Sequence, residues 1–465
     1  MNSSSQILKP SGSKHKLFVY IVGLTAALSG LLFGIDAGVI SGALSFIKND
    51  FNLTTGSTEM VVTAILIGAI IGALASSFIS RKYGRHFSLV VSAAIFSIGA
   101  LLSATAINVN MLILVRIFLG IGLGIASSTA PVYLSEMAPK SIRGRLITVY
   151  QFMITLGILI AYLSDAFLIS YSYSWRWMLG ITFFPAFLMF LCVLTLPKSP
   201  RWLVLLGKVR EARSVLSRIR NHDEIEDELA EIRNTFNQSA PMASLLKSRQ
   251  FMKVLCLGMI LQIIQQMSGI NAVIYYAPKI FQYAGFSTDT QQMWATVLVG
   301  LVNMLVTIVS IAYIDKLGRK PILYFGLLLT STSMLCLGYL FHIGLTTVFA
   351  QYFAVALVLI FVCGFATSLG PIIWILCAEI YPLRVREIGM TVATVTNWVF
   401  NAIVGGFFLT VVNSIGIAST FVGLSILSYL SLIFIIGFCP ETKGVSLEKI
   451  ESNLMAGNSC RKLGG

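Results

Sequence analysis

The chain has 465 residues, of which 56% are hydrophobic and only 11% are charged, whereas a soluble domain carries roughly 25% charged residues. Its formal net charge is +14, and its seven cysteines are odd in number and lie mostly within apolar runs. This composition excludes a soluble enzyme and a secreted disulfide-rich domain, and it predicts that most of the chain lies in lipid.

Twelve apolar runs are long enough to cross a bilayer, whose hydrocarbon core of about 30 Å needs about 20 residues per helix. The first six lie at residues 18–47, 60–79, 87–108, 111–135, 146–170 and 177–196. The next six lie at residues 252–284, 293–314, 321–342, 349–378, 387–412 and 418–438. The first run is too long, and the segment before it too polar, for a cleavable signal peptide. We therefore predict an all-α membrane protein with twelve transmembrane helices.

The distribution of positive charge predicts the orientation of these helices. Of the 33 Lys and Arg residues, 29 lie on one side, three lie in the alternate loops (Lys48, Arg176 and Lys279), and Arg116 lies within a span. Because Lys and Arg are retained in the cytoplasm, we expect both termini there, in a multi-pass protein of the plasma (inner) membrane. The basic excess then reflects topology, and we expect no nucleic-acid partner.

Residues 198–250 form the one long polar segment between spans. Apolar residues recur there at helical spacing beside acidic residues (Ile225, Leu229, Ile232 and Phe236), and Lys208–Ile219 has a similar pattern. These amphipathic helices predict a helical linker that covers the cytoplasmic helix ends, with a regulatory module as the alternative. The predicted organisation is a cytoplasmic segment, a six-helix bundle, the cytoplasmic linker, a second six-helix bundle and a cytoplasmic tail, at residues 1–17, 18–197, 198–250, 251–438 and 439–465.

The two halves of the chain repeat each other at the ends of corresponding spans. The sequence RKYGR at residues 81–85 follows span 2, and DKLGR at residues 315–319 follows span 8. The pattern E-x-x-P-x-x-x-R begins at Glu136 after span 4 and at Glu379 after span 10. Parallel repeats of six spans predict two bundles related by an axis along the membrane normal, with a site between them near the midplane. Rocking of the bundles about that site gives alternating access.

Charged residues at these span ends can act as a cytoplasmic gate. An ion pair between the bundles would hold that side shut, and breaking the pair would let it open. Retention of positive charge in the cytoplasm is the alternative explanation, which we favour for Lys82, Lys316 and Lys320. The gate candidates are the residues whose charge and spacing are repeated: Arg85, Glu136, Arg143, Arg319, Glu379 and Arg386.

Asp36 is the clearest acidic residue within a span. An ionised carboxylate is costly in a membrane unless a cation is near, and Arg116 in span 4 is the one buried cation available. We expect Asp36 to take a proton from outside, release Arg116, and then lose the proton inward. A permanent structural ion pair is the alternative. Asp165, at the outer end of span 5, is expected to be a solvated residue at the edge of a loop.

Several motifs resemble the sugar porter family of the major facilitator superfamily, over residues 17–455. They are the Gly-Arg pairs after spans 2 and 8, P-x-Y-x-x-E-x-x-P-x-x-x-R-G at 131–144, SPRWL at 199–203, PETKG at 440–444, and QQ-x-SG-x-N at 265–271 followed by Tyr275-Tyr276. The run YQ-x-MIT-x-GI at 150–158 is most similar to bacterial galactose and arabinose proton symporters. Ser80 and Lys198 stand where many members have Asp and Glu, and both departures bear on the gate pairs of the first half.

The resemblance implies proton-coupled import of a monosaccharide of the galactose, glucose, arabinose or xylose class. Its expected partners are the sugar, a proton and the lipid bilayer, with no cofactor or metal, in a functional monomer. An acid at Asp36 is similar to proton-coupled members, whereas facilitative carriers generally lack it. A facilitative uniporter and a transporter-like sugar sensor remain the alternatives. Neither a P-loop nor a catalytic motif occurs in the sequence, so we expect neither an ATP-driven pump nor an enzyme.

The predicted sugar site combines amides with aromatic rings, because a sugar presents hydroxyl groups and apolar C–H faces. The residues that the resemblance implies are Gln151, Gln265, Gln266, Asn271, Asn303, Trp374 and Asn397, with Phe33 lining the cavity and Tyr275 and Tyr276 capping its outer side. For any one of these amides, hydrogen bonding between helices is the alternative role. Trp374 follows Pro371, which permits a bend and makes span 10 a moving gate.

Overall fold

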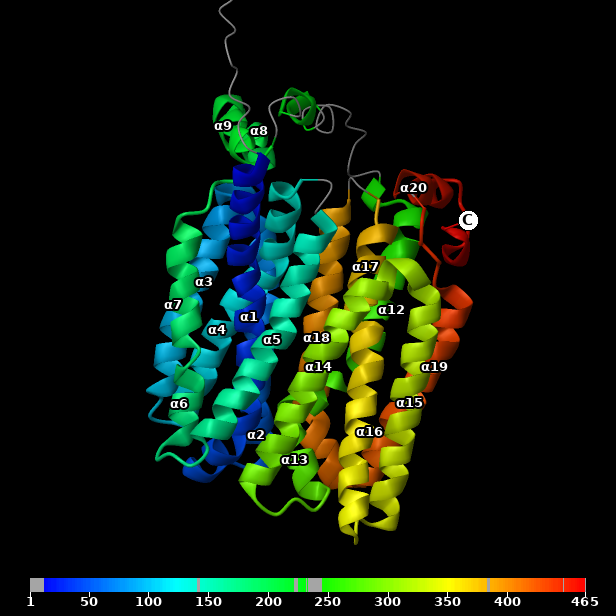
Figure 1. Cartoon of the computed structure of the whole chain (residues 1–465). Coiled ribbons are helices and arrows are strands. Elements are labelled where there is room, and N and C mark those ends of the chain that lie inside the picture. The colour runs from blue at the N-terminus through cyan, green and yellow to red at the C-terminus, as the bar shows by residue number, and fades with distance from the viewer. Residues whose placement is uncertain are drawn as a thin grey trace, which may run out of the picture.

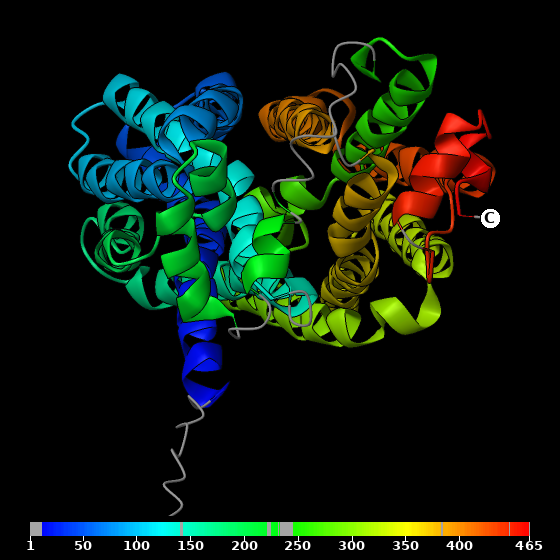
Figure 2. The same cartoon turned by 90° about the horizontal axis from the view of Figure 1, so that it is seen from above.

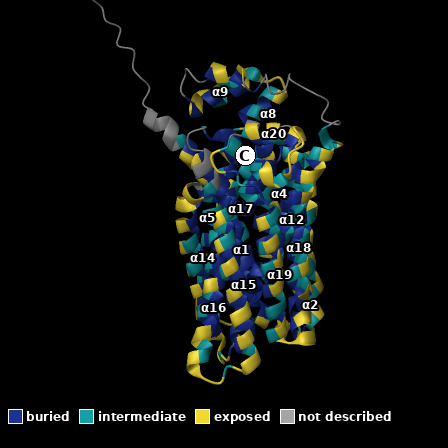
Figure 3. Ribbon diagram, turned by 90° about the vertical axis from the view of Figure 1, so that its right-hand side faces the viewer, coloured by how far each residue is buried: buried dark blue, intermediate teal, exposed yellow. Residues whose placement is uncertain are grey.

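The computed structural model describes residues 12–139, 143–220, 225–230, 232, 245–382, 385–445 and 447–464. Over these residues all regular secondary structure is helical. Twelve helices or helix pairs are long and apolar enough to cross a membrane, as the sequence predicts. Large apolar side chains are exposed around the outside of the molecule, among them Phe78 and Phe184 at 67% and 71% exposure, and Figure 3 shows such exposed positions along the outer helix faces. An apolar outer surface of this kind fits a lipid environment.

The spans form two bundles that lie side by side in Figures 1 and 2. The N-terminal bundle comprises α1 (Gly12–Asp50), α2 (Thr55–Tyr83), α3 (Arg85–Ala104), α4 (Val109–Met137), α5 (Arg143–Leu168), and the pair α6 (Ser174–Gly180) and α7 (Phe183–Leu194). The C-terminal bundle comprises α12 (Arg249–Met267) with α13 (Ile270–Tyr283), α14 (Asp289–Leu317), α15 (Arg319–Ile343), α16 (Val348–Thr367) with α17 (Leu369–Ile380), α18 (Arg386–Ile415) and α19 (Ile417–Phe438). Between the bundles, α2 packs on α18, α5 on α14, and α1 on α13.

Glycines let helices of the N-terminal bundle approach closely. On α1, a Cβ atom at Gly34 would lie 1.9 Å from the Ile154 carbonyl oxygen of α5, so no larger residue fits there. On α2, a Cβ at Gly68 would lie 2.0 Å from the Ile117 carbonyl oxygen of α4. Within a membrane, where lipid is as apolar as the side chains, such close packing is a main source of helix association.

Two spans of the C-terminal bundle are broken near their centres. Span 7 stops at Ser268 and resumes after Gly269, whose φ of 85° lies in the left-handed region that favours glycine. Span 10 is interrupted at Ser368, three residues before Pro371. The break therefore lies ahead of the proline expected to bend the span, and Pro371 occupies the first turn of α17, where a backbone N–H has no intrahelical partner to lose.

One end of the molecule carries α8 (Pro200–Leu205), α9 (Val209–Ile219), α20 (Leu447–Met455) and the short helix η1 (Cys460–Lys462). We call this end the terminal face and the other end the distal face (Figure 1). The predicted helix at Lys208–Ile219 matches α9, whose apolar side is buried. Of the second predicted helix, residues 225–230 and 232 are helical, whereas Phe236 lies outside the described residues.

The residue that follows α9 attaches this segment to the N-terminal bundle. Arg220 pairs with Glu228 and donates to the carbonyl oxygens of Met137 and Ala138, both at 3.0 Å, where α4 ends. A cation that satisfies the last carbonyls of a helix stabilises its C-terminus. Arg220 therefore connects the end of α9 to the end of α4.

Candidate functional site

Five amide side chains form a continuous hydrogen-bonded network inside the C-terminal bundle. On α18, Asn397 donates from Nδ2 to Oε1 of Gln262 at 2.8 Å and to Oε1 of Gln265 at 2.7 Å. Next to Gln265 on α12, Gln266 accepts at Oε1 from Nδ2 of Asn271 at 2.6 Å. The network brings together four predicted sugar-binding residues and adds Gln262, which lies about one turn before Gln265 on the same helix.

The network also reaches the broken span 10. Gln265 donates from Nε2 to the carbonyl oxygen of Leu369 at 2.7 Å and to that of Gly370 at 3.2 Å, in the first turn of α17. One amide thus links α12, α17 and α18. Because a buried amide is costly without partners, this side chain holds the three elements in one arrangement.

Three other predicted residues come from other helices. Gln151 on α5 and Trp374 on α17 are half-buried, and Asn303 on α14 is 7% exposed. Among the described residues, no hydrogen bond joins these three to the amide network. Gln151 belongs to the N-terminal bundle and the network to the C-terminal bundle, so a ligand that contacts both would bridge the bundles.

Asp36 and Arg116 meet in a small cavity of about 10 Å³. Nη2 of Arg116 lies 3.7 Å from Oδ2 of Asp36, which is an ion-pair contact longer than a hydrogen bond. Nε of Arg116 donates to the Val61 carbonyl oxygen at 2.7 Å, so the guanidinium stays anchored to α2 independently of the carboxylate. Phe33 and Tyr275 line the same cavity. The charged pair therefore lies next to two residues of the predicted sugar site.

Two residues of α18 complete this region and were not predicted from the sequence. The ring of Trp398 lies 5.3 Å from that of Phe33, across the two bundles. Asn401 accepts a hydrogen bond from the Tyr275 hydroxyl at 3.3 Å. Asn401 lies one helical turn after Asn397, so the i, i+4 spacing of two asparagines was an available signal.

The expectation for Asp165 is wrong. Its side chain is fully buried, and it packs against Gly42 so closely that a Cβ there would lie 2.4 Å from Oδ2 of Asp165. The cause is the seam between α1 and α5, where Gly34, Gly38 and Gly42 recur every four residues and bring α5 against α1 along its length. Asp165 lies in that seam and not at the edge of a loop.

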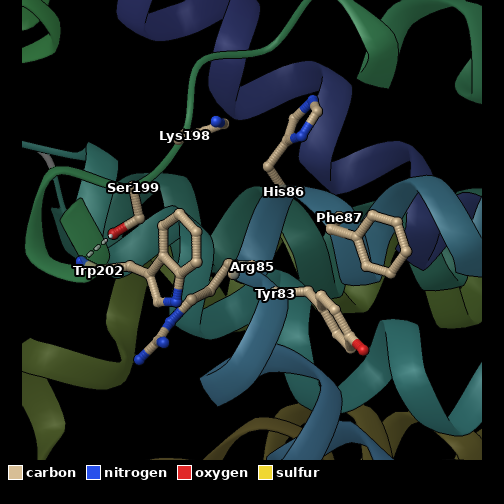
Figure 4. Close-up of a pocket in the computed structure, with 8 residues that line it drawn as sticks. Tyr83, Arg85, His86, Phe87, Lys198, Ser199 and Trp202 are labelled. Carbon is tan, nitrogen blue, oxygen red and sulfur yellow. Dashed lines mark hydrogen bonds between the residues drawn. The ribbon is translucent and has the colours of Figure 1, made fainter. Parts of the chain in front are cut away.

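The ion pair Arg85–Glu136 lies within the N-terminal bundle, not between the bundles as expected. Nη2 of Arg85 lies 3.2 Å from Oε1 of Glu136, and Oε2 accepts from the hydroxyl of Ser199 at 2.5 Å. Figure 4 shows Arg85 and Ser199 close to Trp202, in a pocket of about 230 Å³. The arginine begins α3 and the glutamate lies near the end of α4, so the fold of one bundle brings them together.

The second half repeats this arrangement inside the C-terminal bundle. Arg319 begins α15, and its Nη2 lies 2.9 Å from Oε1 of Glu379 near the end of α17. Oε2 of Glu379 accepts from the hydroxyl of Thr442. Thr442 therefore corresponds to Ser199 as a third member, and each follows the last span of its bundle. Arg386 donates to the Tyr381 carbonyl oxygen at 3.4 Å, and the side chain of Arg143 is not described.

Glu441 extends the arrangement of the C-terminal bundle on the terminal face. Its carboxylate accepts from the backbone N–H groups of Lys320 at 2.9 Å, Arg319 at 3.1 Å and Lys443 at 2.9 Å. Burial acts to raise the pKa of Glu441, but these backbone donors outweigh it and hold the pKa below its usual range. The carboxylate thereby caps the N-terminus of α15 and connects it to the chain after α19.

The chain resembles known transporters along nearly its whole length. The family model described as "Sugar (and other) transporter" matches residues 22–454. The galactose-proton symporter of Escherichia coli (strain K12) is 47% identical over 458 residues, which is 98% of each chain. The arabinose-proton symporter of the same strain is 44% identical over 469 residues, covering 100% of this chain and 99% of the relative.

Solved structures of the xylose transporter XylE from E. coli have the same fold. The partially occluded inward open conformation matches with a TM-score of 0.82 at 30% identity, over 92% of this chain and 100% of that one. The proton:xylose symporter XylE bound to 6-bromo-6-deoxy-D-glucose matches with a TM-score of 0.81 at 31% identity, over 94% and 99%. The chain is therefore a multi-pass membrane protein that belongs to the sugar transporter family of the major facilitator superfamily.

Proposed function

We propose that this protein is a proton-coupled symporter that imports a monosaccharide of the galactose, glucose, arabinose or xylose class by alternating access. The observation that carries this proposal is the shared cavity of Asp36, Arg116, Phe33 and Tyr275. The Asp36 carboxyl, which can exchange a proton, and its partner Arg116 lie there against two residues of the proposed sugar site. The names of the relatives, which are galactose-proton and arabinose-proton symporters, support the same function.

The proposed orientation places the terminal face in the cytoplasm of a cell bounded by its plasma (inner) membrane. The support is the charge distribution along the sequence, which predicts 29 of the 33 Lys and Arg residues on the cytoplasmic side. Residues 18–197 and 251–438 would then be the two moving bundles, residues 198–250 a cytoplasmic linker domain, and 1–17 and 439–465 the cytoplasmic ends. We further infer that the functional unit is a monomer that needs no cofactor.

The sugar would bind between the bundles, with most polar contacts from the C-terminal bundle. Gln265, Gln266, Asn271 and Asn397 supply donors and acceptors held in place by their own network. Gln151 would contact the sugar from the N-terminal bundle, Asn303 would add a further amide, and the Trp374 ring would cover an apolar sugar face. Contacts from both bundles would draw the bundles together when the sugar is bound.

Proton coupling would pass through Asp36. A proton on the Asp36 carboxyl removes the charge that attracts Arg116, and Arg116 keeps its hydrogen bond to the Val61 carbonyl oxygen after release. The carboxylate would regain its partner when the proton leaves to the cytoplasm. The 3.7 Å contact between Arg116 and Asp36 is longer than a hydrogen bond, so the two side chains lose no hydrogen bond to each other when they separate.

The triads on the terminal face would stiffen each bundle so that it moves as one body. Arg85, Glu136 and Ser199 join α3 and α4 to the chain that follows span 6, and Arg319, Glu379 and Thr442 join α15 and α17 to the chain that follows span 12. Arg143 and Arg386 are the gate candidates that follow the two glutamates in the sequence. In this proposal gating depends on rigid bundles and not on an ion pair between them.

The experiment that tests the proposed function compares sugar uptake into proteoliposomes with and without an imposed proton gradient. A symporter accumulates sugar only when the gradient is present, whereas a facilitative uniporter equilibrates sugar at the same rate in both cases. A sugar sensor would bind sugar but transport none. Asp289→Asn is a suitable control variant, which should accumulate sugar as the wild-type protein does. Asp289 is an exposed acid on the distal face and lies outside the proposed site.

A further inference from the structure

A buried carboxylate joins the two bundles on the distal face. Glu59, in the second turn of α2, is 4% exposed. Its Oε1 accepts from the backbone N–H of Thr410 at 2.7 Å, and its Oε2 accepts from the Thr410 hydroxyl at 2.6 Å. Thr410 lies on α18, in the other bundle. Hydrogen bonds to an ionised carboxylate are roughly twice as strong as neutral ones, so this contact resists separation of α2 from α18.

The part of α18 that Glu59 holds also carries contacts from α13. The Tyr276 hydroxyl donates to the Gly405 carbonyl oxygen at 2.7 Å, and its ring stacks on Phe408 with centroids 5.3 Å apart. One turn earlier, Asn401 accepts from the Tyr275 hydroxyl. The segment from Asn401 to Thr410 therefore links the cavity of Asp36 to the distal surface, with Glu59 at its outer end.

The same two helices also meet at the terminal face, but through a weaker contact. There the hydroxyl of Ser77 on α2 lies 3.2 Å from that of Thr391 on α18, and both residues are half-buried and neutral. At the distal rim, Asn413 donates to the Thr55 hydroxyl at 3.1 Å in an exposed position. Of the side-chain contacts between α2 and α18 in the described chain, only the Glu59–Thr410 pair involves a carboxylate, and that carboxylate is buried although Thr410 itself is exposed.

We propose that Glu59 is a positioning residue of the transport cycle, which holds the distal face closed and must release Thr410 before the site can open toward that face. The inference deepens the proposed function, because transport needs the site to open on both sides. The contact itself rests only on geometry within α2 and α18. Loss of a charge-assisted hydrogen bond of this kind shifts the equilibrium between the closed and the open distal face by about tenfold or more.

The test measures the opening of the distal face directly. Spin labels at Gly56→Cys on α2 and Ile415→Cys on α18, both exposed positions, report the distance between the bundles in a background without the native cysteines. We expect one short distance for otherwise unchanged protein, and Glu59→Ala should add a longer population or increase it by about tenfold. Glu59→Gln should give an intermediate result, because an amide can accept from the N–H and donate to the hydroxyl without a charge.

A double-mutant cycle and a matched control separate this role from general stability. Thr410→Val removes only the hydroxyl contact, and combined with Glu59→Ala it should add little to the effect of Glu59→Ala alone. Ser77→Ala breaks the contact at the other end of the same helices and should leave the distal distance unchanged. In transport, Glu59→Ala should lower KM for external sugar, since more protein is open outward, and lower kcat, since closure becomes harder.

Unchanged distance distributions in both Glu59→Ala and Glu59→Gln, with folded protein in each case, would overturn the proposal. Additive effects of Glu59→Ala and Thr410→Val would overturn it as well. The distances need neither sugar nor a proton gradient. If the distal face opens as expected but sugar transport is not coupled to protons, the result counts against the proposed function alone. If symport is found but the distal distances do not change in the Glu59 variants, the result counts against the role of Glu59 alone.

Discussion

Gln266→Ala should weaken sugar binding while leaving the fold nearly intact. The side chain makes one short hydrogen bond, from Asn271 at 2.6 Å, and one long contact to Gln265 at 3.4 Å. Asn271 is half-buried, so its side-chain amide can form a hydrogen bond to water when the Gln266 side chain is removed. A lost amide contact to a sugar hydroxyl costs about 1.0–1.4 kcal/mol, which is about a five- to tenfold rise in Kd.

Gln262→Ala is the matched comparison, because Gln262 is an amide on the same helix and in the same network. It is fully buried, and its Oε1 accepts from Asn397. Its removal should lower the free energy of unfolding by about 1–3 kcal/mol and change sugar affinity less than Gln266→Ala does. Titration of purified protein with sugar, together with thermal unfolding of both variants, measures the two effects. Wild-type affinity with reduced stability in Gln266→Ala would refute the assignment of these amides to the sugar.

Three further outcomes follow from the structure. Trp374→Ala should raise KM for the sugar several-fold with little change in the amount of folded protein, as measured by uptake at varied sugar concentration; an unchanged KM would remove the ring from the site. Glu136→Gln should lower the thermal midpoint of purified protein, because Arg85 keeps its burial but loses a charged partner, and a midpoint equal to wild type would show that the triad does not stiffen the bundle. The pKa of Glu441 is held below its usual range in the folded protein. The stabilisation of the fold by this carboxylate is therefore present above about pH 4.5 and is lost as the pH falls further. In unfolding scans, Glu441→Gln should remove that part of the acid sensitivity.

The spans were predictable because hydropathy is a local property of the chain. The breaks in spans 7 and 10 were not located, because the polar run at residues 265–271 was interpreted as sugar-binding and the bend of span 10 was expected at Pro371, whereas the structure interrupts that span at Ser368. Gly269 was a weak signal, since glycine is common in membrane helices and its positive φ appears only in the structure.

The burial of Asp165 depends on packing between helices distant in sequence, yet a signal for it existed. Glycines recur at every fourth position of span 1, from Gly30 to Gly42, and this spacing favours close approach of a second helix. The sequence could not tell which helix would fill that seam. Asp165, which faces that seam from α5, was therefore expected to be a solvated residue.

The repeated gate motifs identified the charged residues but not their partners. Arg85 and Glu136 are far enough apart in sequence that pairing within a bundle and pairing across bundles were both compatible with the repeat. The third members, Ser199 and Thr442, were visible only as parts of family motifs. Similarly, Gln265 and Asn397 were predicted separately, and the structure supplies the 2.7 Å hydrogen bond that joins them.

The central claim is that Asp36 couples sugar movement to a proton, and Asp36→Asn tests it most directly. The amide imitates the protonated carboxyl and leaves the amide network untouched, so the variant should bind sugar and exchange it down a gradient. In energy-depleted cells, added sugar should make the external medium more alkaline with the wild-type protein and leave it unchanged with Asp36→Asn. Alkalinisation by the variant equal to that of wild type, with equal sugar accumulation, would contradict a coupling role for Asp36.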